Sequence, residues 1–516
     1  MPKTSKIVVT NCGALQAKYL RHYKRVREAI DALIKADVDR GITTRLVALD
    51  DGPTMRRLGG APVLDPEDHR GNKAAIDAVW TGNRPDYIVI IGAPDIVAHQ
   101  NLFNPVYAPG DDDDRFAPSD LPYACDAPYS QQIADFRGPT RVIGRIPDLN
   151  GSGDVHYIEK VLRIAATYRE RPAASYASYF GLTAAVWRKS TALSLAKTFG
   201  GADALHEAPP DGPGWRATQL EPLAHFINCH GGSADTKFYG QSGRSYPVAM
   251  ESPRLDGKIR NGTVVAAECC YGAQLFDPGI PGDMGICNRY LRQGAYAFFG
   301  SSTIAYGPSE GNGSADLICQ SFIQRVLAGS STGRAALEAR LAFVMQATHL
   351  DPTDLKTLAQ FNLMGDPSIT VVGKAGHKLD RTKIYQRAFE GRAQEVGRDQ
   401  RRQRLARDGA MLDATTGAAK KSGGKRKKRT SPRVRKALAA SVRDAGLPPG
   451  VPVAFAVDDP ARRTLGRKVA GTTPSSFHVM HGSAPVEGSD RRRHVVVIAT
   501  LQDGKIVRLR RLHRRG

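Results

Sequence analysis

Two short segments carry the side chains best suited to covalent chemistry in this chain. His230 and Gly231 follow one apolar run, and Cys270 follows a second run and an acidic residue, Glu268. A thiol is only slightly ionised at neutral pH, whereas a nearby imidazole can take its proton and later protonate a leaving amine. Glycine lets a backbone N–H approach a carbonyl closely. The residues predict attack by Cys270 on a carbonyl, assisted by His230, with the N–H groups of Gly231 and Cys270 as an oxyanion hole.

The apolar runs before these segments are predicted to be neighbouring strands of a parallel sheet. Ala224–Asn228 precedes His230, and residues 263–267 precede Cys270. Because the carboxyl ends of parallel strands share one edge, where ligands bind, we expect the imidazole and the sulfur to face each other there. The chemistry also requires the sulfur to be open to solvent, so a sealed sulfur would contradict it.

The first 375 residues alternate short β-branched runs with amphipathic stretches, a pattern typical of parallel strands with helices on both faces. The other expected strands are residues 6–10, 44–48, 87–92, 141–143, 179–185, 297–301 and 369–372. The expected helices are residues 26–34, 74–79, 154–168 and 190–198. The pattern therefore predicts an α/β fold built on an open sheet.

Composition shifts divide the chain further. A charged helix end meets proline and small residues near 169–173, which separates an N-terminal α/β lobe, 1–172, from a lobe with the candidate dyad, 173–375. Residues 376–432 are Arg- and Lys-rich and are expected to be a basic helical or flexible linker. Residues 433–516 are predicted to be a small basic α+β domain, with a helix at 433–443 and a hairpin across Asp503-Gly504.

The positive charge of the chain is confined to its last part. Lys and Arg number 73 and Asp and Glu 51, a formal +22, of which residues 1–375 contribute 39 − 39 = 0 and residues 376–516 contribute 34 − 12 = +22. A basic region of this kind could contact nucleic acid through phosphates, dock an acidic partner, or form an exposed linker that is cut. Its scarcity of aromatic residues argues against stacking on single-stranded bases.

Several other classes of protein and site are excluded or left open. No apolar run is long enough to span a membrane, and the apolar stretch after Lys6 is too short for a secretory signal. Seven cysteines, an odd and sparse number, favour a reducing compartment, so we expect a cytoplasmic protein without a membrane partner. No phosphate-binding loop is present, and no cofactor is expected. The four carboxylates of residues 111–114 could bind calcium or lie in a solvated loop.

The two strand ends together resemble a known family. A strand followed by His-Gly, and another followed by an acidic residue, a small residue, Cys, any residue and Gly, is similar to the caspase-like cysteine peptidases. Within that group the chain most resembles the gingipain-type peptidases, because segments 87–95, 142–147, 294–301 and 362–368 also fit. The resemblance extends over roughly the first 375 residues.

This resemblance implies a caspase/gingipain-like fold and a cysteine endopeptidase that acts on proteins or peptides through a thioacyl intermediate. Cys270 is implied as the nucleophile and His230 as its acid/base partner. Cys270 is preferred to Cys269 because Gly272 follows it as in Cys-x-Gly, and because metacaspase-type peptidases use the second Cys of an acidic-Cys-Cys sequence. The alternative is a catalytically inactive peptidase-like scaffold that binds nucleic acid or an acidic partner through residues 376–516.

Two residues are candidates for reading the substrate. Glu268 stands where metacaspase- and legumain-like relatives line the pocket for the side chain before the scissile bond, and a carboxylate there favours Arg or Lys. Arg188 stands where gingipains carry acidic residues and where caspases use Arg to hold an acidic or amide side chain. We expect a preference for a basic residue, and an Asn-like preference if both side chains enter one pocket.

Overall fold

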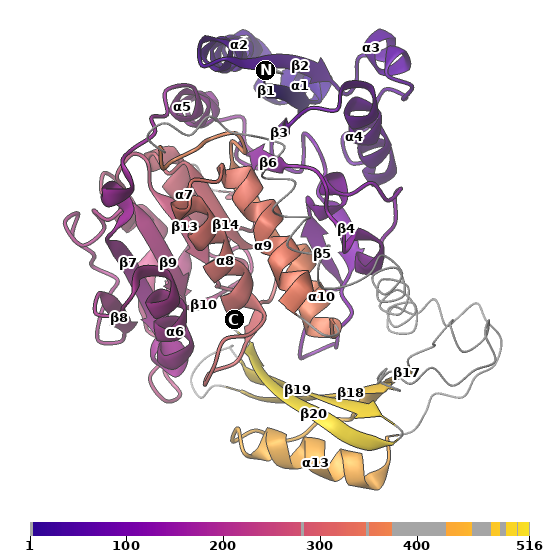
Figure 1. The fold of residues 1–516 in the computed structure, drawn as a ribbon, viewed down its shortest axis with the longest axis vertical. Helices are drawn as coiled ribbons and strands as arrows, with labels where there is room; N and C mark the ends of the chain where they lie inside the picture. The colour runs from indigo at the N-terminus through magenta and orange to yellow at the C-terminus, as the bar shows by residue number, and fades with distance from the viewer. Residues whose placement is uncertain are drawn as a thin grey trace, which may run out of the picture.

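The computed structural model describes residues 4–279, 283–346, 350–373, 430–456, 476–485, 492–502 and 504–514. Within these residues a ten-stranded sheet in the order β2-β1-β3-β6-β16-β14-β13-β9-β7-β8 forms the centre of the molecule (Figure 1). Its strands are β1 Thr4–Thr10, β2 Ile42–Ala48, β3 Tyr87–Ile91, β6 Ile143–Ile146, β7 Tyr179–Ala184, β8 Leu205–Ala208, β9 Ala224–Asn228, β13 Val264–Ala267, β14 Ala297–Ser301 and β16 Phe361–Gly365. This largely parallel sheet confirms the predicted α/β class.

In the described residues the sheet has two groups of parallel strands with one antiparallel strand between them. The strands β2, β1, β3 and β6 are parallel to one another, as are β14, β13, β9, β7 and β8, whereas β16 pairs antiparallel with β14 and is followed by Asp366, which pairs with Lys6 near the start of β1. The two α/β lobes expected on either side of residues 169–173 therefore contribute to one continuous sheet. Their carboxyl-terminal loops lie on the same side of it, because Asp95 and Asn150, after β3 and β6, line a cavity together with Gln274 and Ser302, after β13 and β14.

Helices cover both faces of the sheet. Tyr290 of α7 (Ile286–Gln293) contacts the ring of Phe298, whereas Phe322 of α8 (Ala315–Leu327) stacks on Phe299, the next residue of β14. Adjacent strand residues point to opposite faces, so α7 and α8 lie on opposite sides. On the side of α8, helices α6 (Arg188–Phe199) and α9 (Thr332–Gln346) pack next to it (Figure 1).

The remaining helices of this body are α1 Cys12–Tyr19, α2 Tyr23–Asp39, α3 Gly52–Arg57, α4 His69–Asn83, α5 Val155–Ala166 and α10 Pro352–Gln360. The four helices expected from sequence correspond to α2, α4, α5 and α6. Short strands outside the main sheet are β4 Gln100–Phe103, β5 Phe116–Ser119, β10 His230–Gly231, β11 Lys237–Tyr239, β12 Val248–Glu251 and β15 Tyr306–Gly307. In the described part of the chain, no helix has both the length and the apolar character needed to cross a membrane.

Two expected strands need correction. The strand expected at 141–143 begins at Ile143 as β6 and includes Arg145, a fully buried charge that ion-pairs with Asp120 and breaks the apolar pattern. The strand expected at 369–372 is absent from the described structure there, where Val372 makes only an isolated bridge. The central position between β6 and β14 is instead filled by β16, whose buried Asn362 interrupts the apolar pattern expected of a strand.

The C-terminal part forms a second sheet. In the described residues its elements are α13 Pro432–Arg443, β17 Val453–Ala456, β18 Ser476–Pro485, β19 Arg492–Gln502 and β20 Lys505–Arg514, with the order β15-β20-β19-β18-β17. The predicted helix and hairpin are present, and Gly504 takes a left-handed φ of 79° in the turn. The linker predicted for 376–432 lies almost wholly outside the described residues.

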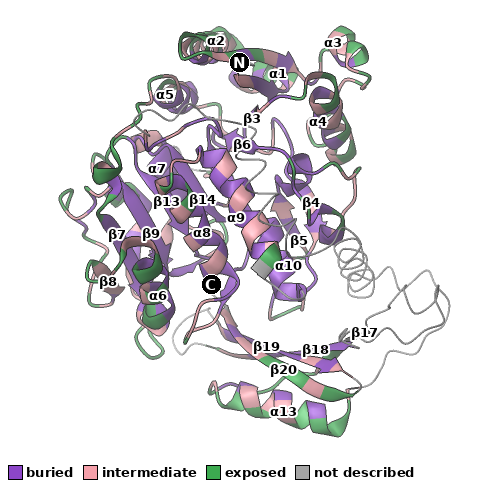
Figure 2. Cartoon of the chain, viewed as in Figure 1, coloured by how far each residue is buried: buried purple, intermediate pink, exposed green. Residues whose placement is uncertain are grey.

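The two faces of this C-terminal sheet contact different partners. Val495 and Val497 of β19 pack in a core with Leu438 of α13, whereas Val496 and Ile498 belong to the core of the main body. Figure 2 shows β18 and β19 largely buried, β20 mostly exposed or intermediate, and the side of α13 away from the sheet exposed. The alternating side chains of a single strand therefore serve two cores.

Candidate active site

The sheet brings the two predicted strand ends together. β9 and β13 are parallel neighbours whose last pair is Ile227 with Ala267, and the N–H of Glu268 extends this ladder to the carbonyl of Ile227 at 2.8 Å. His230 and Cys270 each lie three residues beyond that last pair. Both therefore lie at the same edge of the sheet.

Gly231 lies directly against the backbone of Cys270. His230 and Gly231 form β10, which pairs with β11, and a Cβ built on Gly231 would overlap the carbonyl oxygen of Cys270. Since no rotation of a side chain can relieve a clash of a Cβ with backbone, only glycine fits this position. The contact brings the backbones of Gly231 and Cys270 together at the ends of the two strands.

His230 is oriented by groups that the spacing analysis missed. Its Nε2 donates a hydrogen bond to Oε1 of Gln241 at 2.9 Å, since an amide oxygen can only accept. The imidazole centroid lies 4.4 Å from that of Trp187 and 4.7 Å from that of Tyr246. In the neutral ring this bond leaves Nδ1 as the basic nitrogen. Gln241 and Tyr246 lie after β11 in a turn without any motif, so no sequence signal marked them.

The sulfur of Cys270 is sealed, contrary to the expectation of an open thiol. Cys270 is 0% exposed, and its Sγ accepts a hydrogen bond from the N–H of Ala305 at 3.1 Å. The cause is the loop after β14, which folds back over the strand end, with the N–H of Tyr271 donating to the carbonyl of Thr303 at 2.9 Å. In this conformation a peptide carbonyl cannot reach the sulfur.

The residues on either side of Cys270 differ in character. Cys269 accepts a hydrogen bond from the N–H of Cys229 at 3.4 Å, and burial, with the neighbouring Cys229, raises the pKa of Cys269 well above its usual range. Cys269 is therefore a packing residue whose thiol stays protonated. Tyr271 has φ = 54°, a left-handed conformation that is strained for an aromatic residue. Strain of this kind is often found at functional sites.

Asp114 of the N-terminal lobe fixes the loops on both sides of the sulfur. Its Oδ1 accepts a hydrogen bond from the hydroxyl of Tyr271 at 2.8 Å. Its Oδ2 accepts one from the N–H of Ile304 at 2.8 Å, next to the residue that contacts the sulfur. A single carboxylate therefore ties together the segment after Cys270 and the segment that covers it.

Asp112 is a buried structural anchor rather than part of a solvated loop. It is fully buried, and its Oδ2 lies 2.7 Å from both the Nζ of Lys356 and the hydroxyl of Tyr306. The ammonium of Lys356 compensates the carboxylate charge, which explains why Asp112 can be buried there. In the described residues, no three or more His, Cys, Asp or Glu side chains cluster as metal ligands.

The two candidate specificity residues lie in different surroundings. Glu268 is completely buried beneath the strand end. The side chain of Arg188 is 69% exposed at the start of α6, and its Nε lies 2.9 Å from a carboxylate oxygen of Glu207. The charge of Arg188 is therefore compensated at the surface.

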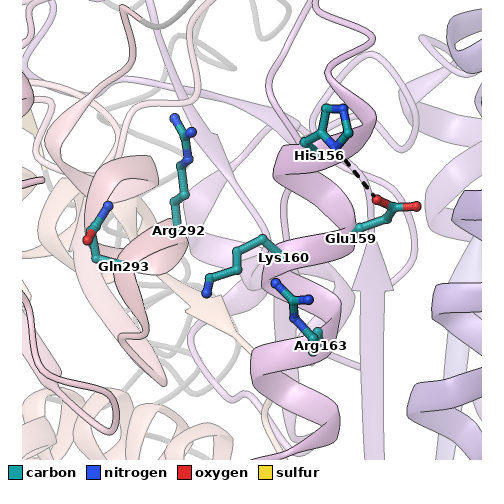
Figure 3. Close-up of a pocket in the computed structure, with 6 residues that line it drawn as sticks. All are labelled: His156, Glu159, Lys160, Arg163, Arg292 and Gln293. Carbon is teal, nitrogen blue, oxygen red and sulfur yellow. Dashed lines mark ion pairs between the residues drawn. The ribbon is translucent and has the colours of Figure 1, made fainter. Parts of the chain in front are cut away.

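A cavity of about 370 Å³ lies between α5 and α7 (Figure 3). Its lining residues are His156, Glu159, Lys160, Arg163, Arg292 and Gln293. Glu159 is turned towards His156 and also ion-pairs with Arg25. None of the candidate catalytic residues lines this cavity, so it is not the place where Cys270 would meet a substrate.

One segment of the chain, which begins at β9, matches a known protein family. Residues 224–372 match the family model of Peptidase family C25. This is a family of cysteine peptidases, and the matched segment contains His230, Gly231, Cys270 and the loop that covers the sulfur. No match was found among curated proteins. The match supports a hydrolase of the cysteine peptidase type.

Proposed function

We propose that this chain is a cysteine endopeptidase that uses Cys270 and His230 as a dyad. The observation that carries the proposal is the junction of two strand ends, where Gly231 packs against the backbone of Cys270 and places His230 at the same edge. That junction lies within the segment that matches a cysteine peptidase family. A solitary buried cysteine would have no need for this arrangement.

In the proposed reaction the loop that covers Cys270 must first open. His230 then takes the thiol proton, and the sulfur of Cys270 attacks the peptide carbonyl carbon. The N–H groups of Gly231 and Cys270 stabilise the oxyanion, each by about 3 kcal/mol. The C–N bond then breaks, and His230 gives its proton to the leaving amine. Water attacks the thioacyl carbon, His230 takes a proton from it, and the carboxylic acid and free thiol are released.

We propose a preference for Arg or Lys before the scissile bond. Glu268, two residues before Cys270, is a carboxylate held at the strand end, and a carboxylate binds a basic side chain by a charge-assisted bond. Arg188 is already paired with Glu207, which favours Glu268 as the selecting group.

A cytoplasmic location is proposed as well. All seven cysteines lie in described residues and are free thiols. A reducing compartment preserves thiols in this state, including the one that the proposed reaction needs.

One observation favours a second function. Because the sulfur of Cys270 is sealed, a catalytically inactive scaffold that binds nucleic acid or an acidic partner through residues 376–516 is the competing proposal. The net charge of +22 in that region supports such a partner.

Hydrolysis of a peptide library by the full chain tests both proposals. Cys270→Ala should abolish cleavage, and Cys269→Ala, the matched control, should retain it because Cys269 only packs. Unchanged turnover in Cys270→Ala would refute the dyad. Absence of cleavage in every variant, combined with salt-sensitive binding of nucleic acid, would favour the scaffold.

A further inference from the structure

The strand next to the sulfur is paired with the C-terminal strand of the chain. β15 begins directly after Ala305, the residue whose N–H contacts the sulfur of Cys270. In β15, Tyr306 pairs with Arg514 and Gly307 pairs with His513, in antiparallel orientation. β20 therefore occupies the backbone edge of the strand that directly follows the residue in contact with the sulfur.

An ion pair holds β20 on the body. The Nη1 of Arg510 contacts Asp351 and lies 2.8 Å from Oδ2 of Asp354, while its Nη2 donates to Oγ of Ser314 at 3.1 Å. Asp351 and Asp354 form the capping box of α10, and their side chains are only 5% and 7% exposed. Two neighbouring buried carboxylates require a cation, and an arginine fork suits them well.

Apolar packing also holds β20 on the main body. Leu512 of β20 is buried in the main body core, together with Val496 and Ile498 of β19. Backbone pairing, charge and apolar contact therefore coincide on one short strand. These are the three requirements for recognising an extended peptide by strand addition.

We propose that β15, together with Asp351 and Asp354, is a docking surface for an extended strand that carries an arginine. Within this chain the occupant of the surface is β20. β20 must leave it before a peptide reaches Cys270. The inference rests on the proposed function only in naming a peptide as the excluded ligand. It adds β20 to the contacts that hold in place the loop after β14, which covers the sulfur in a segment that matches a peptidase family. A substrate strand would compete with β20 for the same N–H and C=O groups of β15.

The test uses full-length chain carrying Arg510→Glu, which places a carboxylate against Asp351 and Asp354. Arg508→Glu is the matched control, because Arg508 lies two residues earlier on the same strand and is exposed. Alkylation of Cys270 by iodoacetamide, located by mass spectrometry, measures access to the sulfur without requiring catalysis. Hydrogen exchange of the β15 and β20 amides measures docking.

Arg510→Glu should speed alkylation of Cys270 by roughly tenfold or more and speed exchange in β20, whereas Arg508→Glu should match the wild type. Faster exchange without faster alkylation would show that β20 does not cover the sulfur. If neither changes, the ion pair does not hold the strand. Either result overturns the inference.

Two further measurements keep the outcomes separate. If Arg510→Glu also speeds exchange in β13, the main body itself has loosened, and faster alkylation could have that cause. Arg510→Lys then serves as the deciding variant, because it keeps the positive charge and loses only the two-pronged guanidinium. It should raise the rate of alkylation of Cys270 by less than Arg510→Glu does. Fast alkylation of Arg510→Glu without any peptide hydrolysis would leave the docking surface standing and overturn the proposed peptidase function.

Discussion

The acidic segment 111–114 and strand β20 both hold the loops around Cys270, but their own stability comes from different places. Asp112 pairs with Lys356 inside the body, where both side chains are 0% exposed, and Asp114 binds Tyr271 and Ile304. β20 belongs to a sheet that has a second core against α13. The contacts of Asp112 and Asp114 lie within the main body, whereas β20 belongs to a sheet that also has a core of its own against α13. The same loops can therefore be fixed on one side and released on the other.

Lys356→Met should have the largest effect, because it leaves the carboxylate of Asp112 buried without its cation. The free energy of unfolding of the full chain should fall by about 3–5 kcal/mol, measured by urea denaturation. Lys189→Met, which breaks an ion pair with Glu310 that is more than two-thirds exposed on each side, should cost less than about 1 kcal/mol. Equal stability of the two variants would show that the acidic segment is not a fixed anchor.

Leu438→Ala should loosen the C-terminal sheet alone. Leu438 is fully buried between α13 and the sheet, so its truncation should cost that unit about 2–5 kcal/mol. Hydrogen exchange should accelerate in β18 and β19 while the amides of β9 and β13 keep their protection. Equal acceleration in both sheets would mean that they open as one unit and that β20 cannot leave separately.

Asp114→Asn should weaken the attachment of Asp114 to the loops around Cys270. The amide has one acceptor oxygen in place of two, so it cannot accept from both Tyr271 and Ile304, and it also loses the charge that faces Lys356 at 3.5 Å. The value of kcat/KM for peptide hydrolysis should therefore fall roughly tenfold. Asp113→Asn is the control, because the exposed Asp113 only accepts a bond from the N–H of Gly110. Similar kinetics in the two variants would remove Asp114 from the positioning of the site.

Mild acid should favour release of β20. Burial, together with Arg511, lowers the pKa of His513 to about 4. A histidine on a released strand titrates near 6.5, so the contribution of His513 to docking is complete above that pH and is lost as the pH falls towards 4. Between pH 7.5 and 6.0 the opening of β20 should rise roughly fourfold, measured by hydrogen exchange corrected for intrinsic rates. His513→Gln should flatten this dependence, and an unchanged slope would contradict the assignment.

Local patterns were enough to predict the strands that end at the dyad. Ala224–Asn228 and the strand before Cys270 are apolar runs bounded by polar residues, and parallel pairing alone puts their ends at one edge. The C-terminal hairpin was equally visible, because Asp-Gly stands between alternating apolar residues. Periodicity and turn chemistry carry information over a few residues, which suffices for such elements.

What the sequence could not reveal depends on contacts between distant residues. Gln241 orients His230 from an irregular turn, Asp112 is buried only because Lys356 folds against it, and β15 becomes a strand only when β20 arrives. The seal on Cys270 has the same origin, since Ala305 contributes backbone atoms that no residue type encodes. Buried charges such as Arg145 likewise interrupt the apolar patterns by which strands are recognised.

The common direction of the parallel strands has a practical use. The loops after β3, β6, β13 and β14 meet at one cavity, so the amino-terminal ends of these strands lie on the side of the sheet away from Cys270. Val38, near the end of α2 and just before β2, is 53% exposed on that amino-terminal side. A fluorophore or surface tether attached through Val38→Cys would immobilise the protein with the side that contains Cys270 facing free solution, so binding and release of peptides could be followed without obstruction.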